Sequence, residues 1–311
     1  MKKIVKENLF IVIPILILVV WYLSSVGQFL NERNTSKEWL INQREECLKN
    51  KKEGLLCERL KDDIYFEKII KEETSIPPAP LLFIYSLVGG AYSTEYITIT
   101  AILFVAVPAI YSFYKDVKNG NYKNKLTREK YKTFIKGHYK NSLKCLLILP
   151  LFVLISFFIT WIISDFRIEY LSSDFNQDFY SKQGYARWLW WPYFATILYA
   201  LICHSIYYIN TAYIMFYKVK NFAINIVATY LCYIVTQTVF VLSICMFLGR
   251  VLGLGEFAIT LQDPEIWLFG KDVSHFEYMI LSSMLYVIFS SLAVFLLYRK
   301  KERFIIVNEQ N

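Results

Sequence analysis

Two ionisable side chains lie inside long apolar stretches of this sequence. Glu95 is near the start of one stretch, and His204 is in the middle of another. If these stretches cross a membrane, both residues are expensive to bury and are candidates for a pathway or for proton transfer, the chemistry that an intramembrane enzyme would use. Each also has a structural explanation, since Glu95 lies where water can reach it and His204 can be a neutral, hydrogen-bonded packing residue.

A face of small and polar side chains forms a second candidate feature. Its members recur at i, i+4, i+7 and i+11, which places them on one side of a helix. Such a face packs helices together, or it lines a pathway or a dimer interface. Both interpretations remain open for Asn225, Thr229, Cys232 and Thr236, with Gln237 beside them.

Other kinds of site are not indicated. The only Gly-Lys pair, Gly270-Lys271, lacks the upstream glycine and the following Ser or Thr of a phosphate-binding loop. The three histidines form no His-Glu-x-x-His pair, and no two cysteines stand at zinc spacing. We therefore expect no catalytic residue, no metal site and no cofactor in this chain, and no ATP hydrolysis by the chain alone.

The composition is that of a polytopic membrane protein. Hydrophobic residues make up 56% of the chain and aromatic residues 18%, more than a soluble core of this size buries. A helix needs about twenty mostly apolar residues to cross roughly 30 Å of hydrocarbon. Six stretches qualify, at Asn8–Gly27, Tyr92–Tyr114, Cys145–Ser164, Trp191–Tyr217, Phe222–Leu248 and Tyr278–Tyr298.

The segment from Lys115 to Lys144 fixes the orientation. It carries ten Lys or Arg residues against two acids, Asp116 and Glu129. Basic residues in short loops face the cytoplasm, so six spans with both termini cytoplasmic are predicted. Tyrosines among the lysines suggest nucleic acid, but contact with anionic lipid headgroups explains a loop held between two helices better. We expect no nucleic-acid partner.

The longest polar piece, Gln28 to Ile76, has apolar residues at helical spacing and a turn near Gly54, so it reads as an extracytoplasmic helical hairpin. Cys47 and Cys57 flank the turn. An oxidising outer compartment would let them form a disulfide, and the sequence leaves open whether they do.

Two further apolar stretches do not fit a single upright helix. Residues 81–114 are too long for one, so a break is expected at Gly89-Gly90, either with an interfacial segment before the span or with a tilt along the bundle. Two crossings there would put a basic segment on the wrong side. Residues 249–277 suit an outer re-entrant or interfacial segment.

At the join between the second span and the basic segment, Asp116 is followed by Gly120, Lys123, Leu126, Arg128 and Lys136. This pattern resembles the permease subunits of ABC-2 type transporters. In that family an acidic residue leaves the second helix and is followed by glycine, a basic residue, leucine, arginine and then a lysine that enters the third helix. Asp116 stands for the usual Glu, Asn121 replaces a Thr, and no Pro-x-Ser precedes the arginine. The matching positions are Gly120, Lys123, Leu126, Arg128 and Lys136.

The resemblance implies a permease of a bacterial inner or plasma membrane that exports an amphipathic, lipid-like or antimicrobial-peptide substrate. A separate cytoplasmic ATPase, holding ATP and Mg, would dock on the basic segment, and a second permease chain would complete a homodimer or heterodimer. An amphipathic helix from Thr127 to Lys144 would present the docking surface. The residues implied in coupling to the ATPase are Asp116, Gly120, Lys123, Arg128, Tyr131, Phe134 and Lys136.

Two alternatives of other classes stay open. One is an intramembrane enzyme that uses Glu95 or His204, and the other is a membrane immunity or interaction protein that acts through the outer hairpin. The expected organisation is an all-α membrane protein divided at 1–27 (terminus and first helix), 28–80 (hairpin), 81–114 (interfacial segment and second helix), 115–144 (coupling segment), 145–248 (third to fifth helices), 249–277 (outer segment) and 278–311 (sixth helix and tail).

Overall fold

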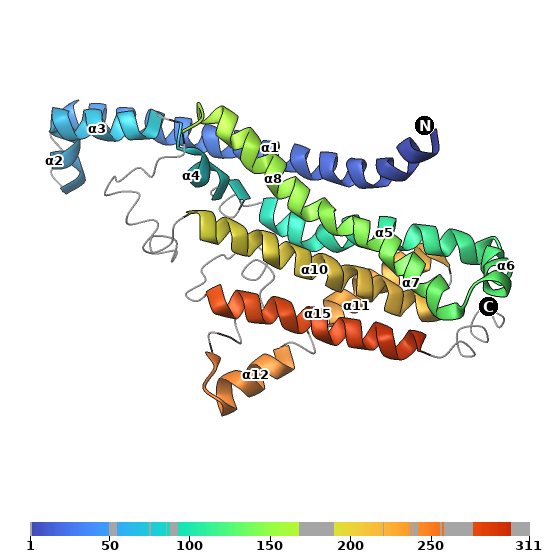
Figure 1. The fold of residues 1–311 in the computed structure, drawn as a ribbon. Helices are drawn as coiled ribbons and strands as arrows, with labels where there is room; N and C mark the ends of the chain where they lie inside the picture. Colours follow the sequence, from blue (N-terminus) through green and yellow to red (C-terminus); the bar gives the residue numbers. More distant parts are fainter. Residues whose placement is uncertain are drawn as a thin grey trace. The chain divides into compact units, whose positions relative to one another are not determined.

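The computed structural model describes residues 2–49, 55–74, 76–84, 86–87, 93–167, 190–219, 221–236, 238, 242–255, 257 and 276–299. Every regular element within these residues is helical (Figure 1). The chain divides into two compact units. Unit 1 comprises Met1–Leu18, Glu95–Leu154 and Ser173–Asn311, and unit 2 comprises Val19–Thr94 and Ile155–Ser172.

Five helices in the described part of the chain are long and apolar enough to cross a membrane. They agree with the predicted multi-pass helical class, whose physical basis is that a helix satisfies its own backbone hydrogen bonds in lipid. These candidate spans are Ile11–Lys49, Thr100–Lys118, Tyr131–Ile163, Phe194–Lys218 and Glu277–Tyr298.

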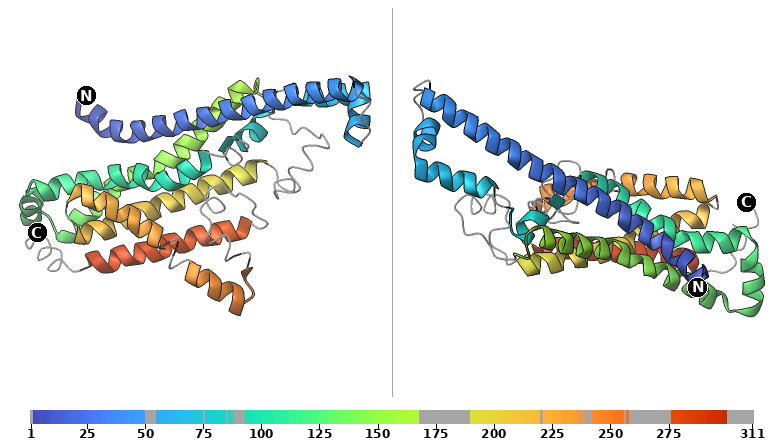
Figure 2. Two further views of the ribbon diagram at one scale, coloured as in Figure 1. Left: turned by 180° about the vertical axis from the view of Figure 1, so that it is seen from behind. Right: turned by 90° about the horizontal axis from the view of Figure 1, so that it is seen from above.

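Helix α1 (Lys2–Lys49) does not end at the predicted boundary near Gly27. It continues through the apolar stretch into the polar one as a single helix, seen end to end in Figure 2. Gly27 meets nothing within 4 Å of an added Cβ and has no left-handed backbone. A glycine in a helix costs only about 1 kcal/mol relative to alanine, so it does not by itself stop the helix.

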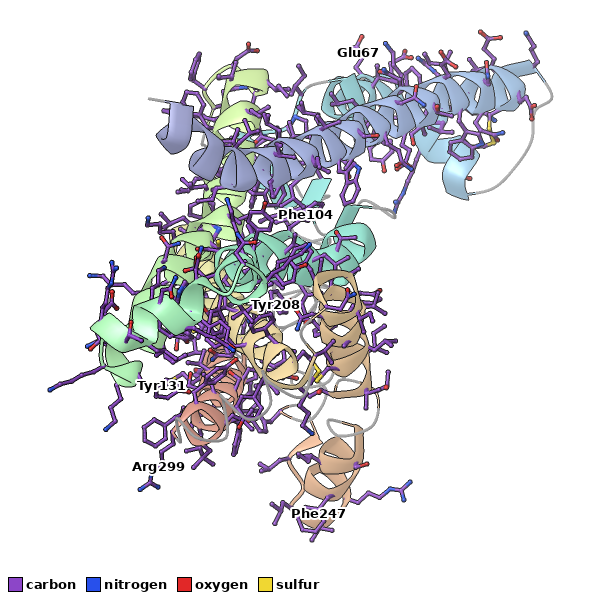
Figure 3. All side chains as sticks on the ribbon, turned by 90° about the vertical axis from the view of Figure 1, so that its right-hand side faces the viewer. Glu67, Phe104, Tyr131, Tyr208, Phe247 and Arg299 are labelled. Carbon is purple, nitrogen blue, oxygen red and sulfur yellow. A yellow bond between two sulfur atoms is a disulfide. The ribbon has the colours of Figure 1, made fainter. Side chains whose placement is uncertain are left out.

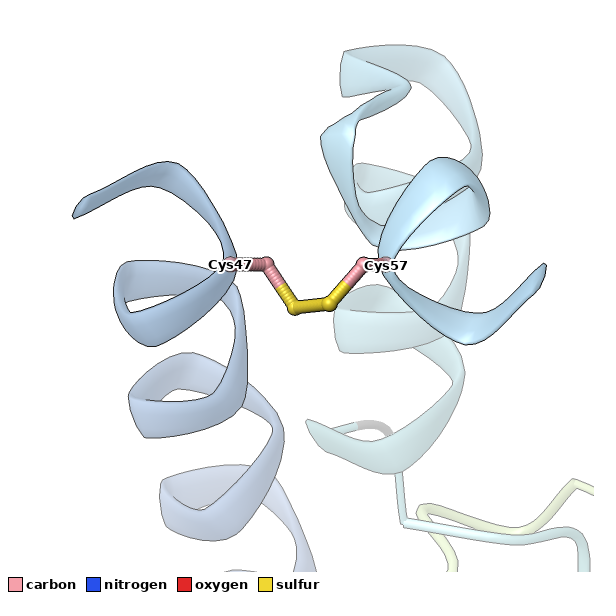
Figure 4. Close-up of a disulfide and its surroundings, with 2 residues drawn as sticks. All are labelled: Cys47 and Cys57. Carbon is pink, nitrogen blue, oxygen red and sulfur yellow. A yellow bond between two sulfur atoms is a disulfide. The ribbon is translucent and has the colours of Figure 1, made fainter. Parts of the chain in front are cut away.

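In unit 2 the end of α1 pairs with α2 (Leu55–Lys61) and α3 (Asp63–Thr74) to form the hairpin. Cys47 on α1 and Cys57 on α2 are joined by a disulfide, with their Cα atoms 5.5 Å apart (Figure 4). Arg44 forms an ion pair with Asp63 and lies 4.1 Å from the Phe66 ring centroid. A covalent link and a cationic contact thus hold the two limbs together.

The short helix α4 (Ala79–Ile84) belongs to the interior of unit 2. Phe83 is buried, with its ring 6.1 Å from Tyr22 and 5.6 Å from Phe157. The Ser25 hydroxyl donates to the Ser86 carbonyl at 2.7 Å. The part of residues 81–88 that is described is therefore buried among other residues of this unit, and the Gly89-Gly90 break lies outside the described residues.

Unit 1 is organised around α10 (Trp190–Lys218). It runs beside α15 (Phe276–Tyr298) and packs against α11 (Phe222–Val235), as Figure 1 shows. Of the five candidate spans, the one in α10 is the most buried, since 72% of the residues in its most apolar stretch are buried. Helix α5 (Ser93–Lys118) leads from the predicted second span into the basic segment.

The predicted fifth span, Phe222–Leu248, contains α11 and most of a second α-helix within the described residues. Helix α11 ends at Val235, about 21 Å long at 1.5 Å per residue and short of the roughly 30 Å of hydrocarbon. Thr236 and Thr238 follow with π-helical backbone, and their hydroxyls donate to the carbonyls of Cys232 and Ile234 at 2.7 and 2.8 Å. The next α-helix is α12 (Leu242–Val251), and residues 237 and 239–241 before it are outside the described residues, so a single continuous fifth span stays a prediction.

The basic segment also divides differently from the predicted helix of residues 127–144. Helix α6 (Asn121–Arg128) ends where Glu129 and Lys130 adopt extended backbone, and α7 (Tyr131–Ser142) begins after them. A short 3-10 turn, η2 (Leu143–Leu147), then joins α7 to α8 (Ile148–Ile163). The amphipathic helix therefore starts at Tyr131, and Thr127 and Arg128 belong to the helix before it.

Candidate functional site

The turn between α5 and α6 depends on Gly120. Its φ of +68° is in the left-handed region, which glycine adopts without the strain that a side chain would bring. Its amide donates to the Val117 carbonyl at 3.1 Å, and its carbonyl accepts from Lys123 at 3.0 Å. Gly120 thus ends α5 and starts α6, so the conformation explains why glycine stands at this position of the predicted motif.

Asp116 joins three helices through one carboxylate. It lies in the last turn of α5, forms an ion pair with Lys125 of α6, and has an oxygen 3.1 Å from His138 Nε2 of α7. The Asp116 side chain is only 18% exposed. Partial burial reduces the screening that makes ordinary surface ion pairs weak. The acidic residue of the predicted motif therefore stabilises the arrangement of α5, α6 and α7.

Phe113 lies about one helical turn before Asp116 on α5, and several aromatic rings surround it. Its fully buried ring lies 4.9 Å from the His138 ring and 6.0 Å from that of Phe134, both on α7. On α10 it stacks on Tyr213 at 5.5 Å and contacts Phe216 at 4.9 Å. The ring therefore fills the space between α5, α7 and α10.

Hydrogen bonds from α7 run across to other helices. Ser142 Oγ donates to the Ala109 carbonyl of α5 and lies 2.8 Å from Tyr213 Oη of α10. Tyr139 Oη donates to Asn210 Oδ1 of α10 at 2.7 Å. The contacts of Asp116, Phe113, His138, Tyr139 and Ser142 with one another and with these partners are called the α7 network below.

Asn210 extends the α7 network to α15. Its Nδ2 makes hydrogen bonds of 3.0 Å with the hydroxyls of Ser290 and Ser291. Nearer the end of α15, the Tyr298 hydroxyl donates to the Tyr213 carbonyl at 2.9 Å. One amide side chain therefore receives a bond from α7 and gives two to α15, so α7, α10 and α15 are connected by directional contacts.

The opposite face of α7 is basic and exposed. Lys132, Lys136 and Lys140 follow one another at four-residue spacing on this face, which we call the lysine face, whereas Tyr131, Phe134 and Ser142 are buried on the other. Of the residues implied in coupling, Lys123, Arg128 and Lys136 are exposed. Tyr131 and Phe134 are 7% and 2% exposed, so they hold the helix in place and leave the surface to the basic residues.

The candidate pathway residues lie elsewhere in unit 1. His204 on α10 is fully buried, and its Nδ1 lies 2.8 Å from the Ala200 carbonyl. Asn225 and Thr229 are buried on α11, which packs against α10, and Thr236 is half-buried after its end. Glu95 lies in the first turn of α5, but its side chain and Gln237 are outside the described residues.

The ring of His204 belongs to a group of tyrosines that sequence reasoning missed. It lies 5.4 Å from Tyr286 and 6.4 Å from Tyr208, which is labelled in Figure 3. Tyr207 is 5.0 Å from Tyr286, and Tyr233 of α11 is 5.7 Å from Tyr208. These five residues are called the tyrosine cluster below. The adjacent Tyr207-Tyr208 pair beside a histidine in an apolar run was the signal that could have found it.

Among the described residues, no group of three or more His, Cys, Asp or Glu side chains could hold a metal ion. Comparison with known proteins adds no identification to this geometry. No protein-family model, no curated protein and no solved structure matches the chain.

Proposed function

We propose that this chain is the membrane-spanning permease subunit of an ABC transporter, driven by a separate ATPase that docks on the basic segment. The observation that carries the proposal is the α7 network. It links an exposed cationic surface to α5, α10 and α15, each of which contains a candidate span. A subunit without a nucleotide site needs such a connection, because the work of ATP hydrolysis must reach the membrane helices from outside the chain.

The two faces of α7 suit this transmission. Packed interiors deform little. A displacement of α7 should therefore also move the helices that contact it through buried rings and hydrogen bonds. The lysine face lies on the side of α7 opposite these buried contacts, so a partner can bind the lysines without disturbing those contacts. An acidic docking surface on the ATPase complements this charge.

The rest of the proposal follows the permease resemblance. The chain makes six crossings, with both termini and the basic segment in the cytoplasm of a bacterium, and the disulfide-bonded hairpin lies on the oxidising side. A second permease chain completes the pathway. The substrate is an amphipathic, lipid-like or peptide molecule, and ATP with Mg binds to the partner ATPase.

Co-purification from the native membrane tests the proposal. The tagged wild-type chain is compared with Lys132→Glu/Lys136→Glu, which reverses charge on the lysine face alone. A second variant, Gly120→Pro/Arg128→Glu, alters the α5–α6 turn and reverses one charge at the end of α6. The matched control is Lys49→Glu/Arg59→Glu, at exposed positions of the hairpin. Bound proteins are identified by mass spectrometry.

We expect an ABC ATPase to be recovered with the wild type and with the hairpin control, and to be lost with both variants of the basic segment. Recovery with every variant would place the docking surface elsewhere. Absence of an ATPase from all samples would overturn the proposal and return attention to an enzyme using Glu95 or His204, or to an interaction protein acting through the hairpin.

A further inference from the structure

The tyrosine cluster is a concentration of electron-rich rings within the helices of unit 1. Tyr207 and Tyr208 come from α10 with His204, Tyr233 comes from α11, and Tyr286 comes from α15. Ring centroids of neighbouring members lie 5.0 to 6.4 Å apart. His204 and Tyr208 are fully buried, whereas Tyr207, Tyr233 and Tyr286 keep 6 to 8% of their surface exposed. All five residues are therefore buried within unit 1, and three of them keep a small exposed fraction.

No formal charge of either sign accompanies these rings in the sequence. Residues 190–217, 222–248 and 278–298 contain no Asp, Glu, Lys or Arg. An anion would find no cationic partner in these stretches. A cation would find the negative faces of aromatic rings, which attract ammonium groups without a carboxylate.

Two buried polar side chains on the same helices have no hydrogen-bond partner within the part of the chain that the structure describes. Asn225 is fully buried on α11, and neither its Oδ1 nor its Nδ2 makes a hydrogen bond within the described part of the chain. Ser283, one turn before Tyr286 on α15, is also fully buried, and its hydroxyl has no hydrogen bond there. Most buried polar groups of native proteins are paired. The oxygen atoms of both side chains have lone pairs that can attract a cation.

We propose that the tyrosine cluster binds the head group of a quaternary ammonium amphiphile, the substrate class of the transporter. This inference rests on the permease function proposed above. A quaternary ammonium has no N–H group that needs a hydrogen-bond acceptor, so burial costs it less than a primary ammonium. Its diffuse charge suits ring faces, and its alkyl chain suits the lipid beside the bundle. The rings contact one another here, so they must separate to admit the cation.

Equilibrium dialysis with the chain purified in a non-ionic detergent tests the proposal without any ATPase. The probe is radiolabelled dodecyltrimethylammonium, and the comparison is its neutral analogue with a tert-butyl group in place of the trimethylammonium. Binding to empty micelles is subtracted. We expect the wild type to bind the cation at least about ten-fold more tightly than the neutral analogue.

Variants then locate the preference. Tyr286→Leu removes a ring and is expected to reduce it to less than about two-fold, whereas Tyr286→Phe keeps the ring and should retain it. Tyr199→Leu, on α10 outside the cluster, is the matched control and should bind as the wild type does. Equal binding of the two probes by the wild type would overturn the proposal even if Tyr286→Leu failed to fold. Retention of the preference by a folded Tyr286→Leu would also overturn it.

The binding assay and the co-purification test different proposals, so the failure of one can be distinguished from the failure of the other. Recovery of an ATPase with no preference for the cation would leave the permease function standing and remove this substrate class. Cation binding without any ATPase would leave the site standing and remove the proposed use.

Discussion

The α7 network and the tyrosine cluster are both built from tyrosines on α10 and α15, yet they are held together differently. In the network, the hydroxyls of Tyr139 and Tyr298 donate to groups on other helices. In the cluster, ring centroids from neighbouring helices lie 5.0 to 6.4 Å apart, and Asn225 and Ser283 lie buried without partners in the described part of the chain. Directional bonds specify one arrangement, whereas ring contacts tolerate several, so one region suits transmission of movement and the other suits adaptation to a ligand.

The largest loss of stability is expected when the Phe113 ring is removed from the α7 network. Phe113→Ala removes a fully buried ring that contacts α7 and α10, and should lower the free energy of unfolding by about 3–5 kcal/mol. Unfolding in mixed micelles, followed by circular dichroism, measures it. Phe158→Ala, at a ring that is 52% exposed on α8, is the control and should change stability far less. An equal loss in both variants would contradict a special role for Phe113.

A smaller loss is expected from the hydrogen-bond centre. Asn210→Ala removes one bond from α7 and two to α15, and at about 0.6 kcal/mol for each bond within a membrane the sum is about 2 kcal/mol. If α7 transmits movement, ATPase activity of the assembled complex should also become independent of substrate. Full retention of that dependence would show that coupling takes another route.

A gain in stability, in place of a loss, is expected when the side chain of Asn225 is replaced. Asn225→Leu replaces a buried polar side chain that has no described partner with an apolar one of similar size, and should raise stability by about 1 kcal/mol. The same unfolding assay measures the change. Destabilisation would mean that Asn225 is satisfied in the native membrane, and the contrast between the two regions would weaken.

The smallest change in the free energy of unfolding is expected when a single tyrosine hydroxyl is removed from either region. Tyr139→Phe keeps the ring and loses the bond to Asn210, which should cost about 0.6 kcal/mol. Tyr286→Phe, in the tyrosine cluster, should leave stability within about 0.5 kcal/mol of the wild type. Equal losses at the two positions would show that the hydroxyls of the cluster are bonded as firmly as those of the network.

The sequence was most informative where a local property decides the structure. Apolar runs of sufficient length predicted the multi-pass helical class, and the spacing of Cys47 and Cys57 around a turn indicated which cysteines lie together. The hydropathy of the fifth run gave no sign of the π-helical backbone at Thr236 and Thr238. Uniform apolarity does not record where the hydrogen-bond pattern of a helix changes.

Contacts between distant residues could not be predicted in the same way. The bond between Tyr139 and Asn210 joins residues 71 apart in sequence, and Asn210 and Ser290 are 80 apart. Their meeting depends on the register of α7, α10 and α15, which no single helix pattern contains. The sequence singled out Asp116, Gly120 and Arg128 and predicted an amphipathic helix in the basic segment, but the partners of its buried side and the tyrosine cluster emerged only from the packing.

The unbroken length of α1 sets a scale for the molecule. At 1.5 Å per residue, its 48 residues extend about 72 Å, more than twice the roughly 30 Å of a hydrocarbon layer. A helix that enters the lipid near its beginning must therefore carry its far end well into the aqueous phase. The disulfide of Cys47 with Cys57, beside Lys49, then lies in water beyond the lipid, where an oxidising compartment would maintain it.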